Sequence, residues 1–205
     1  MLRELYLEEF LEKTASKEPV PGGGSVAALC GALGSSLGAM VSNLTIGKKN
    51  YIEHDEKMKE IAARLEGKRI RFLELIDEDA QSFDEVMGLF KLPKETDEEK
   101  ALRAEKLEAG FKLAAEVPYQ VADLAASLME DLEYLVKNGN KNAVTDALVA
   151  TMLSRTATLA ALYNVKINLG SIKDEAYTAD MKQKVSHLEN FVQNREKELL
   201  ELVTF

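Results

Sequence analysis

An uncharged stretch rich in small residues constrains this chain more than any other feature. No Asp, Glu, Lys or Arg occurs between Glu18 and Lys48. A run of that length is long enough to cross a bilayer. It opens with Pro19, Pro21 and three glycines, however, and later places Gly, Ala and Ser where a lipid-facing helix has Leu, Ile and Phe. We therefore expect a helix over residues 24–46 that is buried inside protein and not in a membrane.

Small residues dominate one side of this predicted helix. Gly31, Gly34 and Gly38 each weaken a helix by about 1 kcal/mol relative to Ala. That cost is tolerable when small side chains let another backbone approach closely. We expect this helix to be the central one and to lie against its twin in a homodimer.

The remaining segments also have helical periodicity, and only four prolines interrupt them. Polar N-cap residues near Thr96 and an Asn-Gly-Asn turn after Lys137 mark helix ends. Residues 164–170 alternate apolar and polar side chains, which we interpret as a loop. The further helices are predicted at residues 2–15, 55–90, 97–137 with a kink or break at Pro118, 143–163 and 174–202. Long helices with short loops predict an all-α fold, an antiparallel bundle around the central Gly/Ala-rich helix, in a single domain over residues 1–205.

Charge and cysteine content limit the partners and the compartment. The net charge of −9 repels nucleic acid and anionic membrane surfaces, so neither is an expected partner. The single cysteine, Cys30, forms no internal disulfide, which fits a cytoplasmic location. We interpret it as apolar filler and not as a nucleophile. His54 and His187 have no metal-ligand spacing, so no metal is expected.

The first candidate site is the loop Gly22, Gly23, Gly24 and Ser25. Glycines let a ligand approach the backbone, and the following helix presents free N–H groups and a positive dipole end. The loop matches neither the P-loop nor the dinucleotide motif, and an ordinary entry loop explains it equally well.

Two further groups of residues carry candidate chemistry. Lys48 and Lys49 follow the same helix, where they either bind a carboxylate or complement the helix C-terminus, while Tyr51 either stacks on a flat ring or packs. Asp79 and Asp146 lie on apolar stretches, where a carboxylate needs a partner or a function. For Asp146 the partner is either Arg155 or the dipole of its own helix; Asp123 is a weaker candidate of the same kind.

Five segments in order resemble one family. They are PGGGSVAAL (21–29), MVSNLTIGKKNY (40–51), DEDAQSF (77–83), GNKNAVTDA (139–147) and AALYNVKINL (160–169). Their order and spacing are similar to those of the formimidoyltetrahydrofolate cyclodeaminase and methenyltetrahydrofolate cyclohydrolase family, over nearly the whole chain.

The resemblance implies chemistry on a tetrahydrofolate derivative by a cytoplasmic lyase of one-carbon metabolism. The cyclodeaminase converts 5-formimidoyltetrahydrofolate to 5,10-methenyltetrahydrofolate and ammonia, with no cofactor beyond the folate. The resemblance also implies that Asp79 and Asp146 act as acid/base groups or cation stabilisers. It implies that Lys48 and Lys49 bind the glutamate tail. If the family base is a histidine, only His54 is placed to serve. The implied substrate-binding set is completed by Gly22, Gly23, Gly24, Ser25, Asn43, Thr45, Tyr51, Asn140, Asn142, Asn164 and Asn168.

Two other functions stay open on sequence alone. The cyclohydrolase reaction uses water as the attacking group on methenyltetrahydrofolate, and the same pocket would serve it. A non-enzymatic bundle that binds partners through the Gly/Ala-rich helix would explain the glycines as a turn and the lysines as a C-cap.

Overall fold

Helices make up nearly all of the computed structural model, which describes residues 1–204. Within that range no strand occurs, which confirms the all-α prediction. The α-helices are α1 (Leu7–Thr14), α2 (Gly23–Thr45), α3 (Asp55–Leu89), α4 (Asp97–Ala126), α5 (Leu128–Asn138), α6 (Val144–Leu169) and α7 (Glu175–Glu201). Three short 3₁₀ helices are η1 (Leu2–Glu4), η2 (Lys49–His54) and η3 (Lys141–Ala143).

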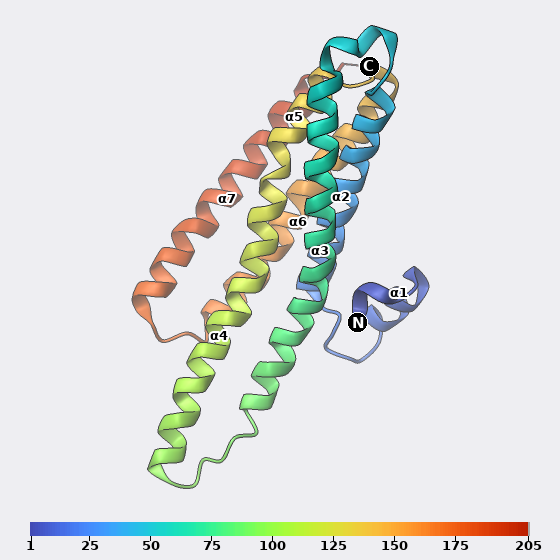
Figure 1. Cartoon of the computed structure of the whole chain (residues 1–205). Coiled ribbons are helices and arrows are strands. Elements are labelled where there is room, and N and C mark those ends of the chain that lie inside the picture. Colours follow the sequence, from blue (N-terminus) through green and yellow to red (C-terminus); the bar gives the residue numbers. More distant parts are fainter. Residues whose placement is uncertain (205) are drawn as a thin grey trace.

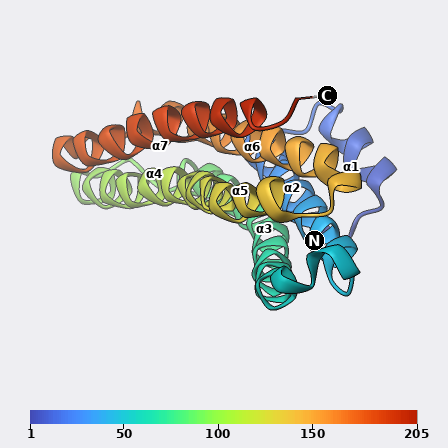
Figure 2. The ribbon, with the colours of Figure 1, turned by 90° about the horizontal axis from the view of Figure 1, so that it is seen from above.

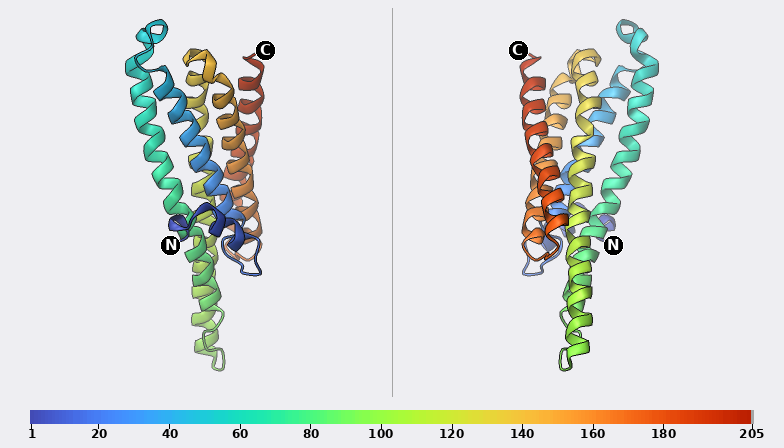
Figure 3. Two further views of the ribbon diagram at one scale, coloured as in Figure 1. Left: turned by 90° about the vertical axis from the view of Figure 1, so that its right-hand side faces the viewer. Right: turned by 90° about the vertical axis from the view of Figure 1, so that its left-hand side faces the viewer.

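The long helices form an antiparallel bundle with α2 at its centre (Figure 1). Helix α2 contacts α3, α4, α5 and α6, and α7 packs on the far side of α6 (Figure 2). The lower halves of α3 and α4 project as a hairpin beyond the ends of α2, α6 and α7 (Figure 3). The prediction of a bundle around a central Gly/Ala-rich helix is therefore confirmed.

Side chains from other helices of the same chain fill the space beside the glycines of α2. A Cβ on Gly31 would lie 2.4 Å from the ring of Phe72 on α3, and one on Gly38 would lie 2.8 Å from Leu65 Cδ1. Both Phe72 and Leu65 are fully buried. The close approach predicted from the small residues is thus made within the chain, to α3 at Gly31 and Gly38.

The opposite side of α2 carries larger apolar side chains that remain exposed. Leu33, Met40 and Leu44 are its exposed members. Helix α2 is long and apolar enough to cross a membrane, but 56% of its most apolar window is buried in the bundle. It therefore packs here as a core helix.

The N-terminal segment differs from the predicted continuous helix over residues 2–15. Helix η1 ends at Glu4 and the backbone is extended at Leu5. Asp77 on α3 holds the first turn: its Oδ1 accepts the N–H groups of Leu2 (2.6 Å) and Arg3 (3.3 Å), while Arg3 Nε pairs with its Oδ2 at 3.2 Å. These contacts tie η1 to α3, and the extended backbone at Leu5 separates it from α1.

The predicted loop over residues 164–170 is also wrong. Helix α6 continues to Leu169, because Leu162, Val165 and Leu169 are buried at helical spacing. Arg155 on this helix forms an ion pair with Glu196 on α7 (3.4 Å), so the alternative that pairs it with Asp146 is wrong.

The predicted helix start after Thr96 and the predicted helix end near Lys137 are confirmed. Thr96 caps α4 by accepting the N–H of Glu99 (3.1 Å), and α5 ends at Asn138 before Gly139. Helix α4 continues through Pro118, and the break lies at Ser127 instead.

Candidate functional site

A cavity of about 410 Å³ lies at the start of α2, beside the base of the α3–α4 hairpin. It combines a carboxylate, backbone groups of the glycine loop, amide side chains and aromatic rings. The lining comes from the α2 entry loop, α3, α4 and α6: Pro19, Val20, Gly22, Gly23, Gly24, Asp79, Ser82, Phe83, Val86, Met87, Phe90, Phe111, Ala114, Asn164, Ile167 and Asn168.

Asp79 is the acidic group of this cavity. It is partly buried, and the hydroxyl of the fully buried Ser25 donates to its Oδ2 at 2.9 Å. Burial raises the pKa of Asp79, while hydrogen bonds from the Ser25 hydroxyl and N–H act in the opposite direction. No ion pair to Asp79 occurs within residues 1–204. Burial thus favours the protonated form of this carboxyl more than water does.

Glycine at residue 24 is required by the position of this carboxylate. A Cβ there would lie 2.1 Å from Asp79 Oδ1 and 2.6 Å from its Cγ. Asp79 thus sits at the N-terminus of α2, where the helix dipole favours negative charge and no side-chain cap is present. A structural role as a cap supplied by α3 is consequently an alternative to a catalytic one.

Two asparagines on α6 face the same cavity, one turn apart. Asn164 donates from Nδ2 to its own helix at Ala160 O (3.0 Å), and Asn168 donates from Nδ2 to Ala114 O on α4 (2.6 Å). Pro118 has no N–H, so it leaves the Ala114 carbonyl without its usual helical donor. The proline thereby provides the acceptor that orients Asn168. The side-chain oxygens of both asparagines accept no hydrogen bond from residues 1–204.

The aromatic wall of the cavity was not predicted as part of the site. Phe83 and Phe90 are 37% and 46% exposed and line the cavity with Phe111. Phe90 and Phe111 meet edge to face, with ring centroids 6.0 Å apart. The sequence signal for these residues is the group of large apolar side chains at the end of α3, which also includes Val86 and Met87.

Another part of the predicted site lies at the opposite end of α2. Lys48, Lys49, Tyr51, Asn140 and Asn142 line a separate open depression there. Lys48 and Lys49 are exposed.

The polar groups beside this depression are largely used in holding loops together. Asn140 donates its N–H to Thr45 Oγ1 (2.9 Å) and its Nδ2 to Leu44 O (2.9 Å), and its Oδ1 accepts the N–H of Asn142 (3.1 Å). The Tyr51 hydroxyl accepts the N–H of Lys141 (3.1 Å). The exposed Asn43 lies near this end of α2 in another shallow depression.

One chain therefore does not bring all the predicted residues together. The residues of α2 span about 33 Å at 1.5 Å per residue. Asp146 lies in the first turn of α6, about 27 Å along the helix from Asn164. Of the predicted site residues, these lie at or beside the cavity: Gly22, Gly23, Gly24, Ser25, Asp79, Asn164 and Asn168.

No histidine is among the residues within 1–204 that line the cavity. No group of three His, Cys, Asp or Glu side chains placed to hold a metal occurs in the part of the chain that the structure describes. His54 lies at the far end of α2, where its Nδ1 is 3.0 Å from the Tyr134 hydroxyl. What the cavity offers is a protonatable carboxyl, amide acceptors and flat apolar walls, which suits acid/base chemistry on a flat heteroaromatic molecule.

Comparison with known proteins gives the family. The family model described as formiminotransferase-cyclodeaminase matches residues 6–187. A methenyltetrahydrofolate cyclohydrolase from Methylorubrum extorquens is 39% identical over 174 residues, which cover 85% of this chain and 84% of that protein. A formimidoyltransferase-cyclodeaminase from Sus scrofa is 34% identical over 182 residues, 89% of this chain but 34% of that longer protein.

A solved structure agrees over the full length. The crystal structure of formiminotetrahydrofolate cyclodeaminase from Thermotoga maritima superposes with a TM-score of 0.88 at 31% identity and covers 98% of both chains. The bundle is thus that of a known class of helical enzymes. The chain belongs to the formiminotransferase-cyclodeaminase family. The prediction of an enzyme is confirmed, and the non-enzymatic bundle is not supported.

Proposed function

We propose that this chain is a formimidoyltetrahydrofolate cyclodeaminase, a lyase that converts 5-formimidoyltetrahydrofolate to 5,10-methenyltetrahydrofolate and ammonia. The observation that carries the proposal is Asp79, a partly buried carboxyl with a raised pKa and no cationic partner in residues 1–204. A carboxyl whose protonated form is favoured by burial is suited to deliver a proton to a leaving amine.

The chemistry assigns Asp79 one step. A folate N–H nitrogen attacks the formimidoyl carbon and closes the ring, and the proton of that nitrogen passes to the amine. The Asp79 carboxyl supplies one further proton, the carbon–nitrogen bond to the amine breaks, and the amine leaves as ammonia. The resulting carboxylate lies next to the cationic methenyl product and stabilises it. No cofactor beyond the folate is needed for this balance.

The rest of the cavity supports binding of the pterin ring. Phe83, Phe90 and Phe111 offer aromatic faces to a flat ring. The free side-chain oxygens of Asn164 and Asn168 can accept its N–H groups. These roles account for the amide and aromatic lining together.

A second candidate is the methenyltetrahydrofolate cyclohydrolase reaction. It is favoured by the name of the 39% identical relative from Methylorubrum extorquens. In that reaction water attacks the methenyl carbon, and Asp79 as carboxylate would accept the proton of the water. The two reactions share a cavity and differ in ammonia release.

The deciding experiment offers each folate to the purified protein. Incubation with 5-formimidoyltetrahydrofolate should release ammonia and generate the methenyl chromophore at equal rates, and Asp79→Asn should do neither. Loss of the chromophore from added methenyltetrahydrofolate, without ammonia from the formimidoyl compound, would assign the cyclohydrolase instead. A folate at 100 times its Kd should stabilise the fold by about 2.7 kcal/mol; inactivity and no stabilisation by either folate would contradict both assignments.

We also propose that the enzyme is a cytoplasmic homodimer formed through the outer face of α2. Leu33, Met40 and Leu44 make this face apolar and exposed, and no charged residue interrupts α2. Sedimentation of the wild type and of Leu33→Glu tests it. A dimeric wild type and a monomeric, folded variant are expected, whereas a monomeric wild type would contradict the proposal.

A further inference from the structure

The hydroxyl of Ser25 has two acceptors within hydrogen-bond distance. Its Oγ lies 2.9 Å from Asp79 Oδ2 and 3.1 Å from the backbone oxygen of Ile76 on α3. Ser25 is fully buried, so its hydrogen is divided between two acceptors of the protein itself. A serine hydroxyl carries a single hydrogen and therefore donates fully to only one of these acceptors at a time.

The protonation state of Asp79 decides which acceptor is the stronger one. As a carboxylate, Asp79 presents a charged oxygen, and a hydrogen bond to an ionised acceptor is roughly twice as strong as one between neutral groups. As a neutral acid, Asp79 can itself donate to Ser25 Oγ, and the Ile76 carbonyl then accepts the hydrogen of Ser25. Rotation of one O–H bond thus keeps the buried hydroxyl satisfied in both states, without movement of a heavier atom.

The charged neighbours of Asp79 on α3 are bound elsewhere. Asp77 pairs with Arg3 at 3.2 Å, and Glu78 accepts a hydrogen bond of 2.9 Å from Arg71. Helix α2 contributes no charge, and α6 contributes two neutral amides to the cavity. Asp79 is the only titratable side chain among the residues within 1–204 that line this cavity.

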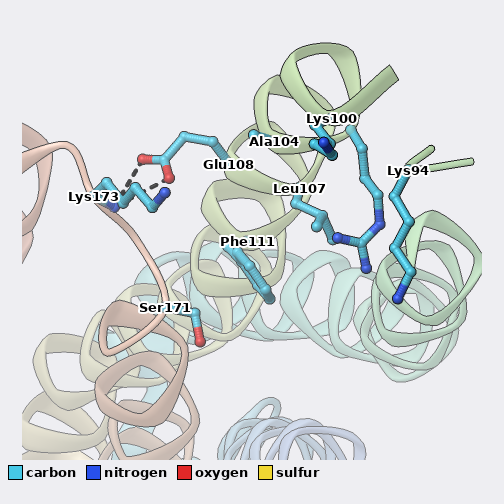
Figure 4. Close-up of a pocket in the computed structure, with 9 residues that line it drawn as sticks. Lys94, Lys100, Ala104, Leu107, Glu108, Phe111, Ser171 and Lys173 are labelled. Atoms are coloured by element: carbon cyan, nitrogen blue, oxygen red, sulfur yellow. Dashed lines mark hydrogen bonds between the residues drawn. The ribbon is translucent and has the colours of Figure 1, made fainter. Parts of the chain in front are cut away.

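Charged side chains from the first half of α4 line a neighbouring pocket, which shares Phe111 with the Asp79 cavity (Figure 4). There Glu108 accepts the N–H of Lys173 (3.0 Å) and so is directed to the α6–α7 connection. The cations of that pocket are Lys94, Lys100, Arg103 and Lys173. Within the described residues, the pKa of Asp79 is accordingly set by burial and by Ser25.

Ser25 reaches a ligand only through Asp79. The lining of the cavity includes the three glycines before it but not Ser25, which lies behind the carboxylate. The close contact of Gly24 with Asp79 Oδ1 fixes the carboxylate on one side, and Ser25 holds Oδ2 on the other. This arrangement suits a residue that controls the orientation and charge of Asp79.

We propose that Ser25 is a positioning residue whose hydroxyl turns from the Ile76 carbonyl to the Asp79 carboxylate as Asp79 gives up its proton. The inference rests on the proposed function and deepens it. When the O–H bond of Asp79 breaks and the new N–H bond of the leaving amine forms, the electron pair stays on the carboxylate, which then accepts the hydrogen of Ser25. Ser25 is thereby assigned to the proton donor and not to the substrate.

Titration of Asp79 itself is the first test, and it requires no turnover. The carboxyl-carbon NMR signal of Asp79 is identified by its absence from Asp79→Asn and followed against pH. The midpoint in Ser25→Ala should lie about one pH unit higher than in wild type, because a hydrogen bond to the charged form is lost. Equal midpoints would overturn the inference and leave Ser25 as a tie between α2 and α3.

A second variant keeps a weaker donor at the same place. Ser25→Cys retains an S–H group of similar size, so its midpoint should fall between those of wild type and Ser25→Ala. A midpoint in Ser25→Cys at or above that of Ser25→Ala would show that the donor is not what matters, and would contradict the proposal.

The pH profile of kcat/KM connects the titration to the reaction. In Ser25→Ala the limb set by Asp79 should move to higher pH by the same amount, whether Asp79 acts as an acid or as a base. Turnover with an unmoved limb would overturn the inference alone. A shifted NMR midpoint in a protein that turns over neither folate would defeat the proposed function and uphold the coupling of Ser25 to Asp79.

Two matched serines serve as controls. Ser42 is also fully buried on α2, but its hydroxyl donates to Gly38 O (3.2 Å). Ser82 donates to the backbone oxygen of Asp79 (2.9 Å) and not to its carboxylate. Ser42→Ala and Ser82→Ala should both keep the wild-type midpoint of Asp79. A rise in either as large as that in Ser25→Ala would overturn the assignment to Ser25.

Discussion

The Asp79 carboxylate lies directly over the backbone of Gly24, so that a Cβ on residue 24 would fall 2.1 Å from Asp79 Oδ1. The glycines at the start of α2 thereby leave room for Asp79, which lies two-thirds of the way along α3. The contact explains why the first turn of α2 has no side chains at this point. It also gives a way to move the carboxylate without removing it.

Gly24→Ala should displace Asp79 and lower kcat/KM by about 10²-fold, because displacement of a catalytic group by about 1 Å has effects of that size. Stability should change little, since the short Asp79 side chain can rotate and Ala favours the helix by about 1 kcal/mol. Steady-state kinetics and urea unfolding measure the two effects. Gly67→Ala is the control: nothing lies within 4 Å of a Cβ there, so it should gain stability and keep full activity.

Asp79→Asn should separate catalysis from capping. Asn caps a helix about as well as Asp, so the fold should be retained. Loss of a general acid should lower kcat by about 10²- to 10⁴-fold. If Asp79 is only a cap, the variant will keep its turnover, and the proposed mechanism will be wrong.

The raised pKa of Asp79 predicts how its effects depend on pH. Burial favours the protonated acid in the folded state, so the stability that this group contributes is present at low pH and is lost as pH rises through its folded pKa. Relative to wild type, Asp79→Asn should therefore become more stable between acidic and neutral pH. Urea unfolding of both proteins across that range measures the difference, and a difference that stays constant with pH would contradict the assignment.

The sequence predicted most of the fold because helix ends are encoded locally. The predicted ranges 24–46 and 55–90 compare with Gly23–Thr45 and Asp55–Leu89. The end of α6 was missed although Leu162, Val165 and Leu169 have helical spacing, because asparagines and Gly170 in the same segment suggested a loop. The predicted N-terminal helix is interrupted at Leu5, and Asp77 of α3 accepts the N–H groups of Leu2 and Arg3, a long-range contact that no pattern within residues 2–15 contains.

The candidate site was only partly predictable. Asp79 and the glycine loop were found because a carboxylate on an apolar stretch and consecutive glycines are unusual on their own. The exposure of Phe83 and Phe90 depends on where α2 and α6 stop, which no pattern within α3 contains. The distance between the lysines and Asp79 likewise follows from the direction of α2 in the assembled bundle.

Pro118 and Asn168 should be energetically coupled through the Ala114 carbonyl. Asn168→Ala removes the donor to that carbonyl and should cost about 1 kcal/mol of stability. In a Pro118→Ala background the new N–H at residue 118 can donate to the same oxygen, so the cost should fall and the double-mutant cycle should show coupling of at least about 0.5 kcal/mol.

A matched asparagine checks the specificity of this coupling. Asn190 on α7 also donates to a carbonyl, that of Ser186 (2.9 Å), but lies away from α4. Asn190→Ala should therefore be additive with Pro118→Ala. Additivity in the Asn168 cycle as well would show that the proline does not provide the acceptor.

Asp146 can take part in the same reaction as Asp79 only if a second subunit supplies it, because about 27 Å separates its position on α6 from the cavity. A two-fold axis across the middle of α2 would place the Asp146 end of one subunit next to the Asp79 end of the other. We therefore predict that mixtures of inactive Asp79→Asn and inactive Asp146→Asn proteins, unfolded and refolded together, recover about a quarter of wild-type activity, since half of the dimers are mixed and each has one intact site. Each variant refolded alone is the control. Full activity of Asp146→Asn would remove that residue from the mechanism, and two inactive variants that fail to complement would show that the site is not shared between subunits.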